Sequence, residues 1–234
     1  IILVPIGGGG LAAGVSTLAK MLNPNIQVIG VEPANAACMK ASLKAGKVVS
    51  LPSAVTIADG TAVKTPGDIV FPYIQKNLDD IITVEDEELI VNFLDVVENH
   101  KMVVENSGLL TVAALKHLNC KDKRVVSILS GGNMDIITMS SVVQHGLIQR
   151  DRIFSASVLL PDKPGQLALV AQTIADAQGN VIKLEHNQFV STNRNAAVEL
   201  RITMEAYGTE HKNQIMKALE EKGFRPREIG AKLY

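Results

Sequence analysis

The first feature that could carry chemistry is a run of four glycines, residues 7–10, followed by Leu11. An apolar run before it predicts a strand over residues 1–6, and apolar residues at helical spacing follow it. Glycines in front of a helix let an anion approach the unpaired N–H groups of its first turn. The pattern predicts a phosphate cradle, with a plain strand-to-helix turn as the alternative.

A second glycine turn, Ser130-Gly131-Gly132-Asn133, follows another apolar run, which predicts a buried strand over residues 124–129. A helix is expected after this turn, so Ser130 has an alternative interpretation as a helix N-cap without a ligand. Two glycine turns that each follow a strand favour a ligand shared by both.

A nicotinamide-dinucleotide site is the main rival interpretation of the first loop. Gly8, Gly10 and Ala13 match the Rossmann spacing, and Glu32 lies about 20 residues further on, where that motif has an acidic residue. Such a site does not require the second glycine turn. We therefore keep the NAD-binding interpretation as an alternative.

The elements needed to position these loops alternate between strand and helix up to residue 146, and this alternation predicts an α/β domain with a parallel sheet. Strands are expected at 1–6, 27–31, 79–84 and 124–129, and helices at 35–45, 85–99, 107–118 and 135–146. Polar residues without periodicity predict a linker at 147–152. A second domain is expected over residues 153–234.

Five motifs of the first domain together resemble the threonine dehydratases, a family that also embraces serine dehydratases and serine racemases. They are Gly7-Gly8-Gly9-Gly10-Leu11, Val31-Glu32-Pro33, Thr56-Ile57-Ala58-Asp59-Gly60, Val104-Glu105-Asn106-Ser107-Gly108 and Ser130-Gly131-Gly132-Asn133. The resemblance implies that residues 1–146 are the C-terminal portion of a pyridoxal-phosphate-dependent catalytic domain of the tryptophan-synthase-β-like type (fold type II).

The same resemblance implies roles for individual residues. Ser130 would face the pyridine nitrogen of pyridoxal 5'-phosphate, and Gly60 and Glu105 either line the cofactor cleft or serve as an ordinary turn glycine and helix cap. The cofactor phosphate would be held by the backbone N–H groups of Gly7, Gly8, Gly9, Gly10 and Leu11.

The implied reaction is deamination of L-threonine, and of L-serine as a second possibility, by β-elimination to a 2-oxo acid and ammonia. A serine hydroxyl does not stabilise a proton on the pyridine nitrogen, which favours elimination over fuller carbanion chemistry. In the family, the Schiff-base lysine lies upstream of the glycine loop. We therefore expect no lysine of this chain to take that role, and the chain alone to be inactive.

We expect no metal site. Some relatives bind a divalent cation through a glutamate equivalent to Glu32, the carbonyl at Ala36 and an aspartate where this chain has Cys38. Hard cations prefer oxygen to a thiol, so the substitution favours Glu32 as a solvated residue at a strand end.

The second domain reads as βαββαβ, the order of a ferredoxin-like α+β sandwich. With Pro161-x-x-Pro164-Gly165-x-Leu167 and Gly179-Asn180-Val181-Ile182, it resembles the ACT regulatory domain. The resemblance implies an amino-acid effector near Asp162, Gly165 and Asn180, and edge-to-edge pairing into a homo-oligomer, a dimer or tetramer. A purely regulatory or oligomerisation fragment is a further alternative.

The amino-acid composition bears on which partners and which cellular compartment the protein could have. The 234 residues are 47% hydrophobic and 20% charged with a formal net charge of −1, which gives no electrostatic support for a nucleic-acid partner. No apolar run approaches the roughly 18 residues of a membrane helix. The two cysteines form no CxxC pair, which favours a reducing, cytoplasmic compartment.

Overall fold

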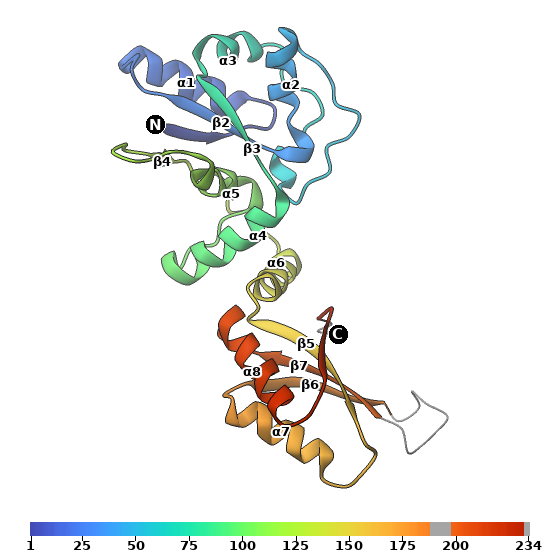
Figure 1. Cartoon of the computed structure of the whole chain (residues 1–234). Helices are drawn as coiled ribbons and strands as arrows, with labels where there is room; N and C mark the ends of the chain where they lie inside the picture. The colour runs from blue at the N-terminus through green and yellow to red at the C-terminus, as the bar shows by residue number, and fades with distance from the viewer. Residues whose placement is uncertain (188–197, 232–234) are drawn as a thin grey trace. The chain divides into compact units, whose positions relative to one another are not determined.

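The computed structural model describes residues 1–187 and 198–231, and the chain divides into two compact units (Figure 1). Unit 1 comprises residues 1–143 and unit 2 residues 144–234. Helix α6 (Ile136–Gln149) runs across this division. The predicted linker at 147–152 therefore overlaps the last turn of a helix.

Unit 1 contains the parallel sheet that the sequence predicts, and its four strands lie in the order β3-β2-β1-β4. Its strands are β1 (Ile2–Pro5), β2 (Val28–Pro33), β3 (Asp80–Val84) and β4 (Val126–Ser127). The prediction of a buried strand over 124–129 is wrong in its length and burial. Only two residues of β4 pair with β1, and the Val126 side chain is exposed at this edge of the sheet.

The helices of unit 1 cover both faces of this sheet. They are α1 (Gly10–Leu22), α2 (Cys38–Ala45), α3 (Phe71–Asn77), α4 (Asp86–Asp95), α5 (Asn106–Ala113) and the start of α6. A π-helical turn, Val96–His100, extends α4, and a 3-10 turn, Ala114–His117, extends α5. Helix α3 was not expected from the sequence, because seven residues are too few to show a helical period.

Two hydrophobic cores form in unit 1, because successive side chains of a strand point to opposite faces of the sheet. Leu3 of β1 packs into a core with Phe93 of α4. The next residue, Val4, packs into the other core with Met39 of α2. Burial on both faces explains why residues 1–6 read as an unbroken apolar run.

Unit 2 has the βαββαβ order that the sequence predicts, with an antiparallel sheet in the order β6-β7-β5-β8. Its elements are β5 (Ile153–Leu160), α7 (Gln166–Asp176), β6 (Asn180–Asn187), β7 (Val198–Glu205), α8 (Thr209–Glu221) and β8 (Pro226–Ile229). Buried residues of β5, β7 and both helices form one core, which includes Val158, Ile174, Ile202 and Ile215. The expected β6–β7 connection at 192–195 lies outside the described residues.

Within the described residues, no helix combines the length and the apolar character needed to cross a membrane.

Candidate functional site

The glycine loop connects the end of β1 to the start of α1. Gly9 is the N-cap of α1 and has φ of 100°, in the left-handed region where glycine is favoured. A Cβ at this position would lie 2.7 Å from Met39 Cε and 2.8 Å from Ile74 Cδ1, both in fully buried side chains. Glycine is therefore required at position 9 by backbone conformation and by packing.

The main-chain donors of this loop have no partner within the part of the chain that the structure describes. No acceptor there takes the N–H groups of residues 7–11. A Cβ at Gly8 or Gly10 would meet no atom within 4 Å. Unpaired donors at a helix N-terminus, with open space beside two of the glycines, are suited to binding an anion.

The second glycine turn lies at the carboxyl end of β4, next to the loop that follows β1, because the two strands are parallel neighbours. In open parallel sheets, ligands bind at this edge. Ser130 is partly exposed there. The N-cap interpretation of Ser130 is wrong, because α6 begins at Ile136 and Asp135 accepts the N–H groups of Ile137 and Thr138.

Glu105 binds the second glycine turn, residues 130–133, through two hydrogen bonds. Its carboxylate accepts the Asn133 N–H at 3.2 Å, and its own N–H donates to the Gly131 carbonyl at 3.3 Å. Gly131 has φ of 91°, and a Cβ there would lie 2.2 Å from Glu105 Oε1. Glu105 occupies the N-cap position of α5, but its side chain makes no capping bond to that helix. The structure therefore shows a contact to the second turn in place of an ordinary cap.

Close contacts also join the remaining motif segments. A Cβ on Gly7 would lie 3.2 Å from the Gly60 carbonyl, and one on Gly60 would lie 2.9 Å from Ser107 Oγ. A Cβ on Gly108 would lie only 2.4 Å from the Ser130 carbonyl oxygen. Segments far apart in the sequence thus approach through positions where a side chain would collide.

A cavity of about 430 Å³ lies beside these segments in unit 1, and Asp59, Glu105, Asn106 and Asn133 are among its lining residues. Asn106 Nδ2 donates to the Ile57 carbonyl at 3.0 Å. Asn106 Oδ1 and Ser107 Oγ are buried without a partner among the described residues. Sequence reasoning did not single out these two side chains, although both stand inside the Val104–Gly108 motif.

Glu32 is fully buried, so the expectation of a solvated residue at the strand end is wrong. Its two carboxylate oxygens accept the N–H groups of Met39 and Lys40, each at 2.8 Å. Burial raises the pKa of the Glu32 carboxyl to about 7, and the two N–H bonds and the Lys40 charge oppose that rise. A carboxylate engaged in this way is not available to a ribose hydroxyl, which weakens the dinucleotide interpretation.

The cation implied for some relatives does not fit here. Both oxygens of Glu32 already accept main-chain N–H groups. The Cys38 thiol is buried, and burial followed by the nearby Glu32 charge raises its pKa to about 11, so it stays protonated at neutral pH. Across residues 1–187 and 198–231, no cluster of three or more His, Cys, Asp or Glu side chains could hold a metal ion.

In unit 2 the structure separates the expected effector residues within one chain. Asn180 opens β6 and pairs with Glu205, which pairs with Ile153 at the start of β5. Asp162 and Gly165 follow Leu160 at the other end of β5. One copy of the chain therefore does not bring all three together.

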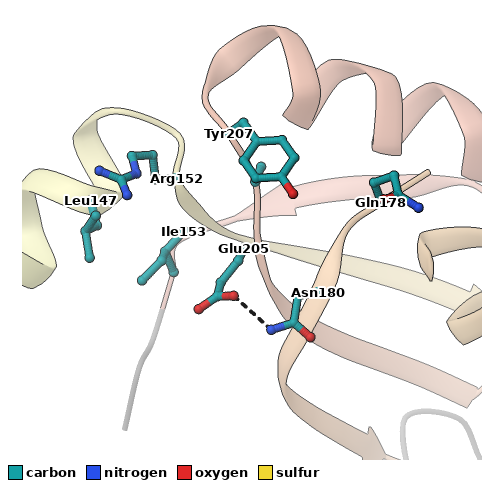
Figure 2. A pocket seen from close by; sticks show the side chains of 8 residues that line it. Leu147, Arg152, Ile153, Gln178, Asn180, Glu205 and Tyr207 are labelled. Carbon is teal, nitrogen blue, oxygen red and sulfur yellow. Dashed lines mark hydrogen bonds between the residues drawn. The ribbon is translucent and has the colours of Figure 1, made fainter. Parts of the chain in front are cut away.

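A pocket of about 270 Å³ lies at the Asn180 end of this sheet (Figure 2). Asn180 Nδ2 donates to the Glu205 carboxylate at 2.8 Å. Arg152 and Tyr207 also line the pocket, so it presents groups of both charges. Sequence reasoning missed these neighbours, because they are ordinary polar residues at the ends of different strands.

With this geometry in place, comparison with known proteins defines the class. Residues 1–131 match the family described as pyridoxal-phosphate dependent enzyme, and the chain belongs to that family. The unpaired N–H groups of residues 7–11 and the open space at Gly8 and Gly10 fit the phosphate group of its cofactor.

Two curated relatives within this family are similar over most of the chain. An L-threonine ammonia-lyase from Geobacter sulfurreducens is 39% identical over 95% of this chain and 56% of its own length. Another from Thermotoga maritima is 34% identical over 98% of this chain and 58% of its own. The chain thus spans somewhat more than half the length of these two relatives.

A solved structure of the processed form of threonine deaminase isoform 2 from Solanum lycopersicum is also similar. It aligns with a TM-score of 0.57 at 34% identity, over 62% of this chain and 43% of that one. This similarity supports the type II fold expected for unit 1.

Proposed function

We propose that the whole protein deaminates L-threonine, with L-serine as a second substrate, to 2-oxobutanoate or pyruvate and ammonia by β-elimination. The similar threonine ammonia-lyases support the reaction class. The observation that carries the proposal is the row of unpaired N–H groups at residues 7–11, together with the open space where a Cβ on Gly8 or Gly10 would lie.

In this proposal, main-chain donors bind the cofactor phosphate. The N–H groups of Gly7 to Leu11 and the positive end of the α1 dipole would offset its charge. Bound pyridoxal phosphate supplies an electron sink for the α-carbon of an amino acid. A phosphate held by main chain keeps its place without relying on flexible side chains.

Ser130 would bond the pyridine nitrogen through a neutral hydroxyl, which favours elimination because that nitrogen then carries no fixed proton. Glu105 would act as a positioning residue for Ser130, because it binds the turn at Gly131 and Asn133. Gly108 supports the same turn by allowing the Ser130 carbonyl to lie against α5. We assign the Schiff-base role to no lysine of this chain and propose that the chain alone is inactive.

The test compares two glycines of α1 in the full-length protein. Gly10→Asp places a negative charge where phosphate would bind, whereas Gly14→Asp places the same charge one turn along the helix, and neither Cβ meets an atom within 4 Å. We expect Gly10→Asp to lose cofactor absorbance and ammonia release from L-threonine, and Gly14→Asp to keep both. If the unaltered protein releases ammonia from neither L-threonine nor L-serine, the proposal is wrong.

We also propose that unit 2 regulates the enzyme by binding a small amino acid in the Asn180 pocket. The pocket offers the Glu205 carboxylate, which binds the Asn180 side chain, for the ammonium group of an amino acid. Asp162 and Gly165 would contribute from a second copy, which requires a homo-oligomer. The free cysteines Cys38 and Cys120 support a cytoplasmic location.

Calorimetric titration of the full-length protein with isoleucine, valine, threonine and serine tests this second proposal. One of the four should bind, and light scattering should show a dimer or tetramer. A monomer that binds none of them would contradict it.

A further inference from the structure

Glu32 is fully buried and has no role in the proposed reaction. Its oxygens accept the N–H groups of the second and third residues of α2, Met39 and Lys40. The N-cap residue of that helix, Ala37, has no side-chain oxygen to offer. A carboxylate from the neighbouring strand β2 therefore supplies the missing cap.

The capped turn of α2 contacts the glycine loop directly. Met39, whose N–H binds Glu32, is fully buried, and its Cε lies 2.7 Å from where a Cβ on Gly9 would be. Gly9, with φ of 100°, is the residue at which the chain turns from β1 into α1. The position of α2 thus determines where the Met39 side chain contacts Gly9.

We infer that Glu32 is a positioning residue for the phosphate loop. Its carboxylate holds the first turn of α2, Met39 transmits that position to Gly9, and the N–H groups of residues 7–11 are thereby kept in one orientation. The inference rests on the proposed function, because it concerns the same anion site. It also assigns the carboxylate a main-chain partner in place of a cation, consistent with the two N–H bonds that occupy it.

The experiment separates phosphate binding from overall stability by using two probes on the full-length apoprotein, pyridoxal phosphate and pyridoxal. Glu32→Gln keeps the volume but replaces one accepting oxygen by an NH₂ group that faces a main-chain N–H. We expect pyridoxal phosphate to bind about tenfold more weakly, the equivalent of one lost hydrogen bond. Binding of pyridoxal, which lacks the phosphate, should stay unchanged. A general loss of structure would instead weaken the binding of both compounds.

Two further variants test whether Glu32 acts on the glycine loop through Met39. Glu87→Gln makes the same chemical change at an exposed glutamate of α4 and should leave both affinities unchanged. Met39→Leu keeps a similar apolar volume but shortens the reach toward Gly9, and should selectively weaken pyridoxal phosphate binding. The double variant Glu32→Gln, Met39→Leu should lose less than the sum of the two, because both act through one contact.

The outcomes distinguish this inference from the proposed function. If the unaltered protein shows no preference for pyridoxal phosphate over pyridoxal, the loop is not a phosphate cradle and both ideas fail. If that preference exists and survives Glu32→Gln, the inference alone fails. It also fails if Mg²⁺ or Ca²⁺ strengthens pyridoxal phosphate binding in the unaltered protein and not in Glu32→Gln, because Glu32 would then be a cation ligand.

Discussion

The candidate sites of the two units are built from different parts of the chain. In unit 1 the unpaired groups are main-chain N–H donors between β1 and α1, and glycines allow the segments around them to approach closely. In unit 2 the pocket is lined by the side chains of Asn180, Glu205, Arg152 and Tyr207. One site thus depends on where side chains are excluded and the other on which side chains are present.

This difference bears on tolerance to substitution. A main-chain site loses a donor only when proline replaces a residue, but it fails when a Cβ enters a position that has no room for one. A side-chain site loses one group at a time and keeps its backbone. Substitutions in unit 1 should therefore have large effects at a few glycines, and those in unit 2 smaller, graded effects.

The largest effect is expected for Gly108→Ala. The new Cβ would lie 2.4 Å from the Ser130 carbonyl oxygen and 2.7 Å from Val104 Cγ1, and the carbonyl belongs to backbone that cannot turn aside. We expect the free energy of unfolding of unit 1 to fall by about 3 kcal/mol, measured by denaturant titration. Gly14→Ala, where nothing lies within 4 Å, should instead stabilise α1 by up to about 1 kcal/mol.

The next largest effect is a pH dependence in unit 1. The pKa of Glu32 is about 7 in the folded state against an ordinary value of 4.5, so the folded chain keeps a proton that the unfolded chain has released in this range. The free energy of unfolding should therefore fall as pH rises from 4.5 to 7, by on the order of 3 kcal/mol. Glu32→Gln should flatten this part of the profile, and an unchanged slope would contradict the prediction.

A smaller loss is expected for Lys212→Met in unit 2. Lys212 Nζ lies 2.8 Å from Asp151 Oδ1 and 3.1 Å from Glu228 Oε2, and its side chain is only 11% exposed. Removing it should lower the stability of unit 2 by about 1 kcal/mol, measured by thermal unfolding. The control is Lys217→Met, whose exposed pair with Glu221 at 3.7 Å should contribute less than about 0.5 kcal/mol.

The smallest effect on stability is expected for Asn180→Ala. It removes the exposed hydrogen bond to Glu205 and should lower the stability of unit 2 by about 0.5 kcal/mol. If Asn180→Ala instead destabilised unit 2 as strongly as Gly108→Ala destabilises unit 1, the contrast between the two kinds of site would not hold.

Prediction from sequence succeeded where a local pattern dictates local structure. Alternating apolar and helical runs predicted the parallel sheet of unit 1 and the βαββαβ order of unit 2. It failed for short elements and for strands whose length depends on pairing with a distant segment. Helix α3 is too short to show a period, and β4, which lies at an edge of the sheet, pairs over only two residues.

The site shows the same division. The glycine loop was predictable, because Gly9 must adopt positive φ and only glycine does so readily. Its support was not, because Glu32 acts on Met39 seven residues away through an N–H group that has no signature in the sequence. Likewise, nothing in the spacing of Asp162 and Asn180 indicates that they lie at opposite ends of β5.

Glycine positions and apolar periods were therefore sufficient to predict the parallel sheet, the βαββαβ order and the glycine loop before α1, since these depend on the conformations open to each residue and its near neighbours. The burial of Glu32, the attachment of Glu105 to the second turn and the grouping of Arg152 with Asn180 and Glu205 were settled only by the tertiary structure. They depend on which distant segments pack together, and that packing determines desolvation and hydrogen-bond partners.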